Sequence, residues 1–434
     1  MEKVLNYFSF LFKRAAKADI IKVFSFTAMS TLVRMLTGLI SVKVVASIIG
    51  PSGIALLGQL NNFSSIAMTI SSGGINNGIT KYIAEYKSSE IKLKLFLSTA
   101  LKLTIVCSML TGLLMILFHQ FLSNHVMLSS EYGYIFVIFG FTISLYALNM
   151  MLISIVNGYK EFKKYVAINI VGSLIGLIFT LSFVYILGLE GALISAVTFQ
   201  SVILIITLMM VRNLPWFKWS FFTKRLNKEV SKKYFRYTMM TFVTAATVPI
   251  SQMLLRGYVI SQISPVEAGW WEGMNRISGA YLMVITSSFT VYYLPRLSEL
   301  TDRLELRKEI IKAYKVIIPM LLVGFTLVYF LRFFIIRILF TAEFLPMENL
   351  FMWQMIGDLF KVCSWLLAFL MVAKSMAKAF IATEIIFALT FIGMGFLFIQ
   401  WNGVVGITQA YMLNYVFYWI TMIILFKKIL FYSK

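Results

Sequence analysis

Long apolar runs separated by short connections, of which every second one is basic, most constrain what this 434-residue chain can fold into. Each run has about 20 residues or more, enough for a helix to cross the roughly 30 Å hydrocarbon core of a bilayer. Strands of a membrane barrel are about half as long and alternate in polarity, so we predict an all-α membrane protein. The twelve runs are Ile20–Ile49, Ile54–Ile79, Leu93–Phe118, Tyr132–Val156, Val166–Leu187, Gly191–Val211, Tyr237–Ile260, Ala268–Leu294, Ile310–Leu339, Leu350–Val372, Phe380–Ile399 and Val404–Phe426.

Lysine and arginine divide the connections between these runs into two sets. The N-terminal segment, the even-numbered connections and the C-terminal end carry basic residues, whereas the odd-numbered connections carry none. Cytoplasmic connections of membrane proteins hold an excess of positive charge. The alternation therefore predicts twelve transmembrane helices with both termini in the cytoplasm, because one missed span would invert the pattern after it.

Composition agrees with a multi-pass membrane protein. Apolar residues make up 60% of the chain and charged residues 13%, whereas soluble domains have roughly half and a quarter. The net charge of +21 is spread over short clusters between apolar runs, so it indicates topology and no nucleic-acid partner. Cys107 and Cys363 lie within apolar runs, so we expect neither a disulfide nor a metal site. The first run is interpreted as a retained span.

The longest basic connection, residues 213–234, divides the runs six and six. It interleaves aromatic and basic residues, which suits both a segment on an anionic membrane surface and a solvated loop. We predict an N-lobe over residues 1–212, this connector, and a C-lobe over residues 235–434. The halves resemble each other weakly, because Lys43 and Arg256 each precede a proline by eight or nine residues. Two matched bundles around a central site are a recurrent transporter design.

Several cations lie inside the runs without an acidic residue one helical turn away, namely Arg34, Lys43 and Arg256. A lysine or arginine at the bilayer centre costs about 2.5–3.5 kcal/mol, so such residues usually face a partner or a water-filled cavity. We predict that these three face a cavity for an anionic substrate. Their counter-ion would then be the substrate itself.

Two acid–base pairs have helical spacing and therefore share a face. Glu272 and Arg276 are four residues apart, and Asp358 and Lys361 are three apart. Pairing that holds helices together explains these four residues as well as a cavity does. The second run also contains amides that suit either cavity lining or helix packing. They are Asn61, Asn62, Asn76 and Asn77.

The chain contains no Walker A sequence, so we expect no built-in ATPase. Four segments resemble Wzx-type O-antigen translocases, the polysaccharide transporter branch of the MOP (MATE-like) exporter superfamily. The similarity is closest to the enterobacterial common antigen flippases and their O-antigen relatives. The segments are Ile48–Phe63, Gly73–Tyr86, Ser287–Leu300 and Leu350–Val362.

The resemblance implies two six-helix lobes that form a V. It also implies a flippase that moves an undecaprenyl-pyrophosphate-linked oligosaccharide from the cytoplasmic to the periplasmic leaflet of the bacterial inner membrane. The cations matched to the central cavity, where they would hold the pyrophosphate, are Arg34, Lys43, Lys81, Arg256 and Arg276. The candidates for coupling or gating are Glu272, Asp358 and Lys361. The four asparagines would line the cavity.

No metal or cofactor is expected, and the sequence leaves the driving ion, H+ or Na+, open. The expected partners are the lipid-linked oligosaccharide, membrane lipid, a polysaccharide polymerase and a chain-length regulator, with the protein working as a monomer. Three alternative functions make different demands on the sequence. A MATE-like drug or cation antiporter would need an acidic cavity, and a multispan polymerase or ligase would need a large outer loop. A membrane scaffold would tolerate neutralisation of every cavity cation.

Overall fold

The computed structural model describes residues 2–86, 88–225 and 227–431, and every regular element in these ranges is helical. The predicted all-α class is therefore confirmed for the described residues. The basic residues Lys87 and Lys434, which helped to assign the sides, lie outside the described ranges. The main helices are α1 (Glu2–Ser71), α2 (Asn76–Tyr86), α3 (Glu90–Leu117), α5 (Gly133–Gly158), α6 (Phe162–Val211), α7 (Lys228–Gln262), α8 (Pro265–Ser288), α10 (Arg303–Phe330), α12 (Glu348–Ala373) and α13 (Ala377–Leu425).

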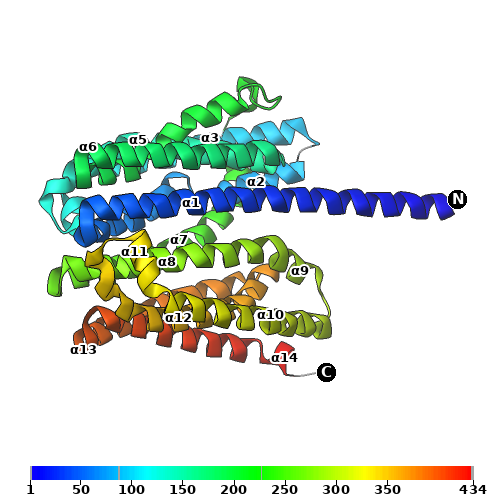
Figure 1. Cartoon of the computed structure of the whole chain (residues 1–434). Coiled ribbons are helices and arrows are strands. Elements are labelled where there is room, and N and C mark those ends of the chain that lie inside the picture. Colours follow the sequence, from blue (N-terminus) through cyan, green and yellow to red (C-terminus); the bar gives the residue numbers. More distant parts are fainter. Residues whose placement is uncertain (1, 87, 226, 432–434) are drawn as a thin grey trace.

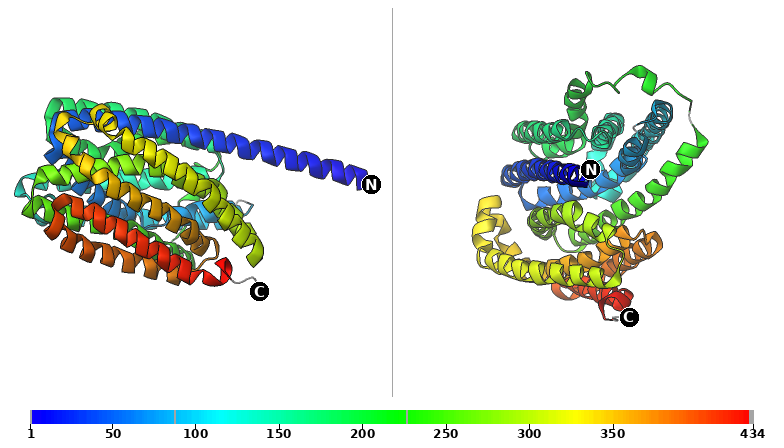
Figure 2. Two further views of the ribbon diagram at one scale, coloured as in Figure 1. Left: turned by 60° about the horizontal axis from the view of Figure 1, so that its bottom comes forward. Right: turned by 90° about the vertical axis from the view of Figure 1, so that its right-hand side faces the viewer.

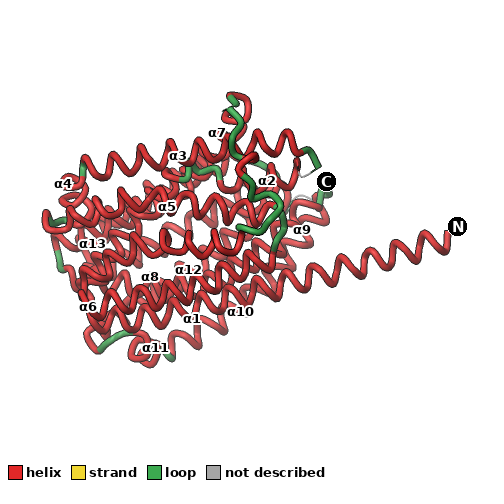
Figure 3. Tube along the Cα trace, turned by 90° about the horizontal axis from the view of Figure 1, so that it is seen from above, coloured by secondary structure: helices red, strands yellow, loops and turns green. Residues whose placement is uncertain are grey.

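Short helical segments join the main helices, and the loops between them are brief (Figure 3). They are α4 (His119–Leu122), α9 (Leu294–Glu299), α11 (Arg332–Leu339) and α14 (Lys427–Leu430), the π turns η1 (Ser123–Met127) and η4 (Phe289–Tyr293), and the 3₁₀ turns η2 (Ser130–Tyr132), η3 (Trp219–Phe221) and η5 (Ala342–Met347).

Seven helical stretches of the described chain are long and apolar enough to cross a membrane. Three of them are far longer than one span needs, because about 20 residues suffice. These three stretches cover 59, 50 and 49 residues. The seven are Ala28–Tyr86, Glu90–Leu117, Ser130–Gly158, Phe162–Val211, Arg303–Phe330, Ala342–Ala373 and Ala377–Leu425.

The three longest helices each contain a break at a predicted cation-free connection. The break in α1 lies at Gly50, that in α6 at Gly188, and that in α13 at Asn402 and Gly403. The three glycines have φ values of 63°, 59° and 57°, which L-residues with a side chain rarely adopt. Each helix therefore consists of two limbs, and both chain termini lie at the end opposite the breaks (Figure 1).

Two predicted runs are interrupted within the structure. The run Ile54–Ile79 breaks after Ser71, where Gly73 and Gly74 have φ values of 65° and 61°. The run Ile310–Leu339 divides into α10 and α11 at Leu331. Hydropathy did not reveal these breaks, because the few polar residues beside them, such as Ser72, Asn76 and Arg332, lie within longer apolar runs.

The helices form two groups, α1–α6 and α8–α14, and α7 runs from the connector into the second group (Figures 1 and 2). One hydrophobic core contains residues of both groups and surrounds the three helix breaks, as Val45, Val184 and Ile399 illustrate. Towards the end with the termini, the cores are separate. One contains Ile75 and belongs to the first group with the start of α7, and the other contains Leu366 and belongs to the second.

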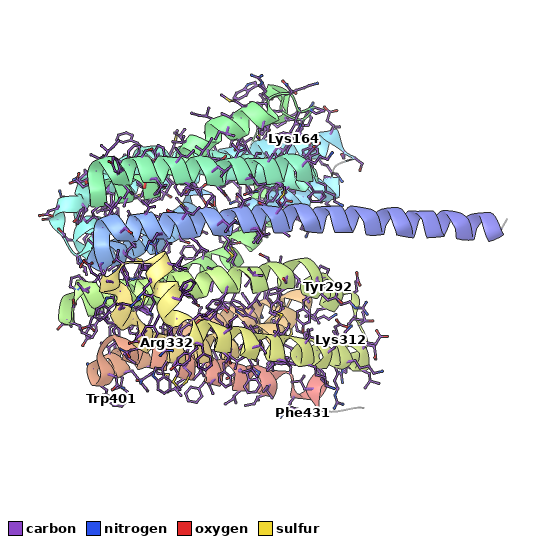
Figure 4. All side chains as sticks on the ribbon, in the orientation of Figure 1. Lys164, Tyr292, Lys312, Arg332, Trp401 and Phe431 are labelled. Carbon is purple, nitrogen blue, oxygen red and sulfur yellow. The ribbon has the colours of Figure 1, made fainter. Side chains whose placement is uncertain are left out.

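The groups therefore share a core at one end only. Figure 4 shows Lys164 and Lys312 near the end with the termini, and Trp401 at the end with the breaks. Below, the break end means the end that contains Gly50, Gly188 and Gly403.

Candidate functional site

A buried charge cluster, which we call the arginine triad, consists of Arg256 on α7 and Glu272 and Arg276 on α8. Arg256 is fully buried and Glu272 nearly so. Arg256 Nη2 donates to Glu272 Oε2 at 2.5 Å, and Arg276 Nε donates to Glu272 Oε1 at 3.0 Å. Each carboxylate oxygen is thus bound by a different arginine. Charge-assisted bonds of this kind are about twice as strong as neutral ones.

The triad confirms one prediction and corrects another. Glu272 and Arg276 pair as their spacing predicts. Arg256 has no acidic residue one helical turn away, but Glu272 binds it from the next helix, so the substrate is not the only available counter-ion for this arginine. Helical periodicity reports only partners three or four residues away, whereas these two residues are 16 apart.

The first helix group contacts the triad through Gly58 and Gln59 of α1. Gln59 Oε1 accepts a bond from Arg256 Nη1 at 3.4 Å, and Gln59 Nε2 donates to the Met253 carbonyl at 3.2 Å. A Cβ atom on Gly58 would lie 2.6 Å from Glu272 Cδ. The close approach therefore requires glycine at this position, and the triad lies at the contact between the two groups.

Besides its acidic partner, Arg256 contacts an aromatic ring, and one of its nitrogen atoms stays unbonded within the described part of the chain. The Trp271 ring centroid lies 5.3 Å from the guanidinium carbon, within cation–π distance. Arg256 Nε is buried without a hydrogen-bond partner among the described residues. The triad holds two cations and one anion, so one positive charge is left over.

Lys43 lies at the break end and joins the two helix groups. Its ammonium donates to the carbonyls of Arg337 at 3.0 Å and Phe340 at 2.5 Å. The first carbonyl belongs to the last turn of α11 and the second to the residue that follows it, where unpaired acceptors and the helix dipole favour a cation. Lys43 therefore stabilises the end of α11.

Arg34 lines a cavity of about 330 Å³ within the first helix group. The cavity lies between α1, α5 and α6 and is also lined by Asn169, Ser173 and Gln200. Arg34 is exposed and forms no ion pair with another described residue. Of the predicted substrate cations, it is the one in a polar cavity without an acidic partner.

Lys81 is on α2, away from the triad, and lies 5.4 Å from the Tyr82 ring centroid. The five predicted cations thus occupy four places and do not form one cluster. Of the predicted lining amides, Asn61 and Asn77 are exposed, and Asn62 and Asn76 are half-buried. Nδ2 of Asn62 is buried without a hydrogen-bond partner in the described part of the chain.

A second polar network lies inside the second helix group. Asp358 on α12 is fully buried and accepts bonds from Ser278 at 2.7 Å, from Tyr411 at 2.7 Å and from Tyr281. Lys361 donates to the Tyr411 hydroxyl at 3.0 Å. Tyr411 therefore links the acid and the base that the sequence placed on one helix face.

A small cavity of about 70 Å³ adjoins this network, between α7, α8, α12 and α13. Lys361, Glu384 and Asn414 line it together with Tyr411. Rings of Trp365 and Tyr415 also lie 5.3 Å and 5.1 Å from the Lys361 ammonium. The sequence did not reveal these aromatic partners. Tyr281 and Tyr411 are more than 50 residues from Asp358, and Trp365 and Tyr415 lie in ordinary apolar runs.

Comparison with known proteins decides the family. Residues 20–301 match the model of a family described as polysaccharide biosynthesis protein. The chain belongs to this family. It is 29% identical over 393 residues to the Lipid III flippase of Escherichia coli K12, covering 90% of this chain and 94% of the relative. The Lipid III flippase of Shigella flexneri matches equally.

Solved structures agree in fold. The Lipid II flippase MurJ in an inward closed conformation has a TM-score of 0.72 at 14% identity, covering 94% of this chain and 87% of MurJ. An inward-facing multidrug resistance MATE transporter of the MOP superfamily has a TM-score of 0.71 at 12% identity, covering 96% and 100%. The predicted relationship is confirmed, and the protein is a multi-span membrane transporter with a MOP (MATE-like) fold.

Proposed function

We propose that this protein is a flippase that moves an undecaprenyl-pyrophosphate-linked oligosaccharide from the cytoplasmic to the periplasmic leaflet of the inner membrane. The match over nearly the full length of the Lipid III flippases supports this function. The observation that carries the mechanism is the core shared by the two helix groups at the break end only. Such groups can part at one end while they stay closed at the other, as alternating access requires.

We propose twelve spans with cytoplasmic termini. Support comes from the seven apolar helices, from the two limbs in three of them, and from α7 and α8, which have 35 and 24 residues. The termini and the labelled lysines at one end of the molecule agree with the positive-inside rule. Labelling of single cysteines from each side of the membrane tests this, and outside labelling of a residue near Lys164 would contradict it.

The two helix groups are proposed to act as lobes, with the N-lobe at residues 1–212, a connector at 213–234 and the C-lobe at 235–434. Helix α7 begins at Lys228, so the end of the connector is already helical. The connector is partly buried, because Trp216 and Phe221 pack into the core of the first group. Separate movement of the lobes predicts that a cross-link between them stops transport, whereas one within a lobe does not.

The pyrophosphate is proposed to contact exposed cations first and the arginine triad afterwards. Arg34 and Lys81 are exposed in this structure, whereas the arginine triad is closed by Glu272. A dianionic head group that reaches the triad can replace Glu272 on the two arginines, because it presents more acceptor oxygens and more charge. Exchange of one anion for another avoids exposing a buried arginine without a partner.

Loss of the protein is expected to leave lipid-linked repeat units on the cytoplasmic side of the membrane. Leaflet-resolved detection of the lipid-linked oligosaccharide in depleted and complemented cells measures this. Equal leaflet distributions with and without the protein would contradict the flippase function. Accumulation of cationic drugs in depleted cells would instead support a drug antiporter, and glycan transfer by the purified protein a polymerase or ligase.

Asp358, Lys361 and Glu384 are proposed to couple transport to proton movement. A lysine ammonium already lies next to these acids, so protonation can change the charge of the network without a second bound cation. Asp358→Asn is expected to abolish the dependence of transport on an imposed pH gradient in vesicles. Glu348→Gln, in the first turn of α12 and outside the network, is the control and should keep this dependence. An unchanged gradient dependence in Asp358→Asn, or dependence on a Na+ gradient alone, would exclude this role.

We also propose that the protein works as a monomer and delivers its product to a polysaccharide polymerase with a chain-length regulator. The flipped repeat unit is the chemical substrate that chain extension on the periplasmic side would need. Transport that scales linearly with protein density in vesicles would support a monomer, and a quadratic dependence would contradict it. Co-purification from the membrane tests the two partners.

A further inference from the structure

A large apolar groove lies where α1, α3 and α7 meet. Its volume is about 680 Å³, more than any cavity of the predicted site described above. Ile70 of α1 and Phe235 of α7 are 42% and 59% exposed, so the groove is accessible from outside the protein. The apolar walls are formed by Ile70, Ile75, Leu103, Cys107, Phe235 and Phe242.

The groove lies on the boundary between the two helix groups. Helices α1 and α3 belong to the first group, whereas α7 leads into the second (Figure 1). The break at Gly73 and Gly74 forms part of the wall, and Thr238 of α7 donates to the Gly73 carbonyl at 2.6 Å. This break follows the second limb of α1, at the end of that limb away from Gly50. In the proposed topology the groove is therefore at the depth of the cytoplasmic leaflet.

One lysine, Lys232, lines the groove. Its side chain is exposed and forms no ion pair with another described residue. The neighbouring Lys233 lies 5.9 Å from the Tyr86 ring centroid and 5.7 Å from that of Phe96, and Lys92 lies 5.2 Å from that of Tyr86. These cation–π contacts hold Lys233 and Lys92 against two rings that do not line the groove. Lys232 is therefore the cation at the groove itself.

We propose that this groove binds the head-proximal part of the polyprenyl chain, with the diphosphate at Lys232. The inference rests on the proposed flippase function. A polyprenyl diphosphate combines a long apolar chain with an anionic group at one end. The groove combines apolar walls with an exposed cation, so the two are complementary in both properties. A diphosphate carries more negative charge than a common anionic phospholipid, so it should bind this lysine more tightly.

The position of the groove gives the binding a role in transport. The polar head must pass between the lobes, whereas the chain must stay in contact with lipid. A groove at the start of α7, where the chain passes from one lobe to the other, satisfies both conditions at once. Because α7 forms one wall and leads into the second group, movement of α7 against α1 and α3 changes the shape of the groove. The groove would therefore hold substrate before the lobes part and release it afterwards.

Photo-cross-linking tests the occupant directly. The purified protein in lipid nanodiscs is irradiated with farnesyl diphosphate that carries a benzophenone on its chain. We expect labelled peptides from α3 and α7, and loss of labelling when undecaprenyl diphosphate is added. Competition by the same amount of phosphatidylglycerol should be weak. Equal competition by both lipids would mean that the groove holds bulk membrane lipid, and labelling elsewhere would mean that the chain does not bind here.

Matched variants test the role in transport. Leu103→Trp fills the groove and is expected to lower the transport of lipid-linked oligosaccharide by about tenfold or more, since overpacked sites exclude a ligand. Leu101→Trp is the control, because Leu101 is half-buried on the same helix but lines a different pocket. Lys232→Glu should weaken cross-linking by the diphosphate probe without affecting folding, because the side chain is exposed. Lys228→Glu makes the same charge change one turn earlier.

The outcomes separate this inference from the function on which it rests. If the wild-type protein moves no lipid-linked oligosaccharide in vesicles, the flippase function fails and the groove proposal fails with it. If the wild-type protein and Leu103→Trp transport equally well, and Lys232→Glu cross-links as strongly as Lys228→Glu, only the groove is wrong.

Discussion

Replacing Gly58 by valine is expected to lower the rate of transport by about tenfold to a hundredfold while the protein still folds in the membrane. A Cβ at this position would lie 2.6 Å from Glu272 Cδ and 3.0 Å from Arg256 Cζ, which belong to the other helix group. Overpacking costs about 1–3 kcal/mol. This cost changes an equilibrium constant by a factor of about 5–150. The cost falls on the state in which the lobes meet at the break end, so the variant should rest with that end open.

The measurement is transport in vesicles together with the labelling of a cysteine at the lobe contact. Gln59→Cys, in a chain whose Cys107 and Cys363 are replaced by serine, is suitable because Gln59 is only 1% exposed. Adding Gly58→Val should speed its reaction with a membrane-impermeant thiol reagent. Gly393→Val is the control, since a Cβ there meets no atom within 4 Å and the residue is exposed on α13. Slow labelling in the Gly58 variant would contradict a closed contact at this place.

The all-helical fold and three of the helix breaks were predictable from the sequence because their signals are local. A lysine cluster, an apolar run and a cation-free turn each leave a signal within about 20 residues. The breaks at Gly50, Gly188 and Gly403 all fall in predicted turns for this reason. The break at Gly73 and Gly74 left a weaker signal, because it lies among apolar and small residues within one run.

The site was predictable only in part, because its partners meet through tertiary structure. Glu272 and Arg276 are one helical turn apart, so spacing revealed their contact. Arg256 meets Glu272 through the packing of α7 on α8, and Lys43 meets α11 nearly 300 residues later. A cation that lacks a neighbouring acid in sequence can thus bind residues that are distant in sequence.

Glu272→Gln is the second variant for which we expect a large effect. It should open the contact between the two lobes and stop transport. Removing one partner of a buried ion pair costs about 3–5 kcal/mol because the other charge stays buried. Here two arginines depend on one carboxylate, and Arg256 is fully buried. The closed state should lose more than about a hundredfold in population, at about 1.4 kcal/mol per tenfold. Gln59→Cys should then react quickly with the impermeant reagent, and transport should fall.

A double variant separates closing the contact from binding the substrate. Replacing a buried ion pair by apolar residues is often neutral, whereas removing one partner is not. Arg256→Met combined with Glu272→Met should therefore restore slow labelling of Gln59→Cys. Transport should nevertheless stay low, because the cation that would receive the pyrophosphate is gone. Normal transport by the double variant would show that Arg256 only closes the contact. Fast labelling would show that the triad is not what holds the lobes together.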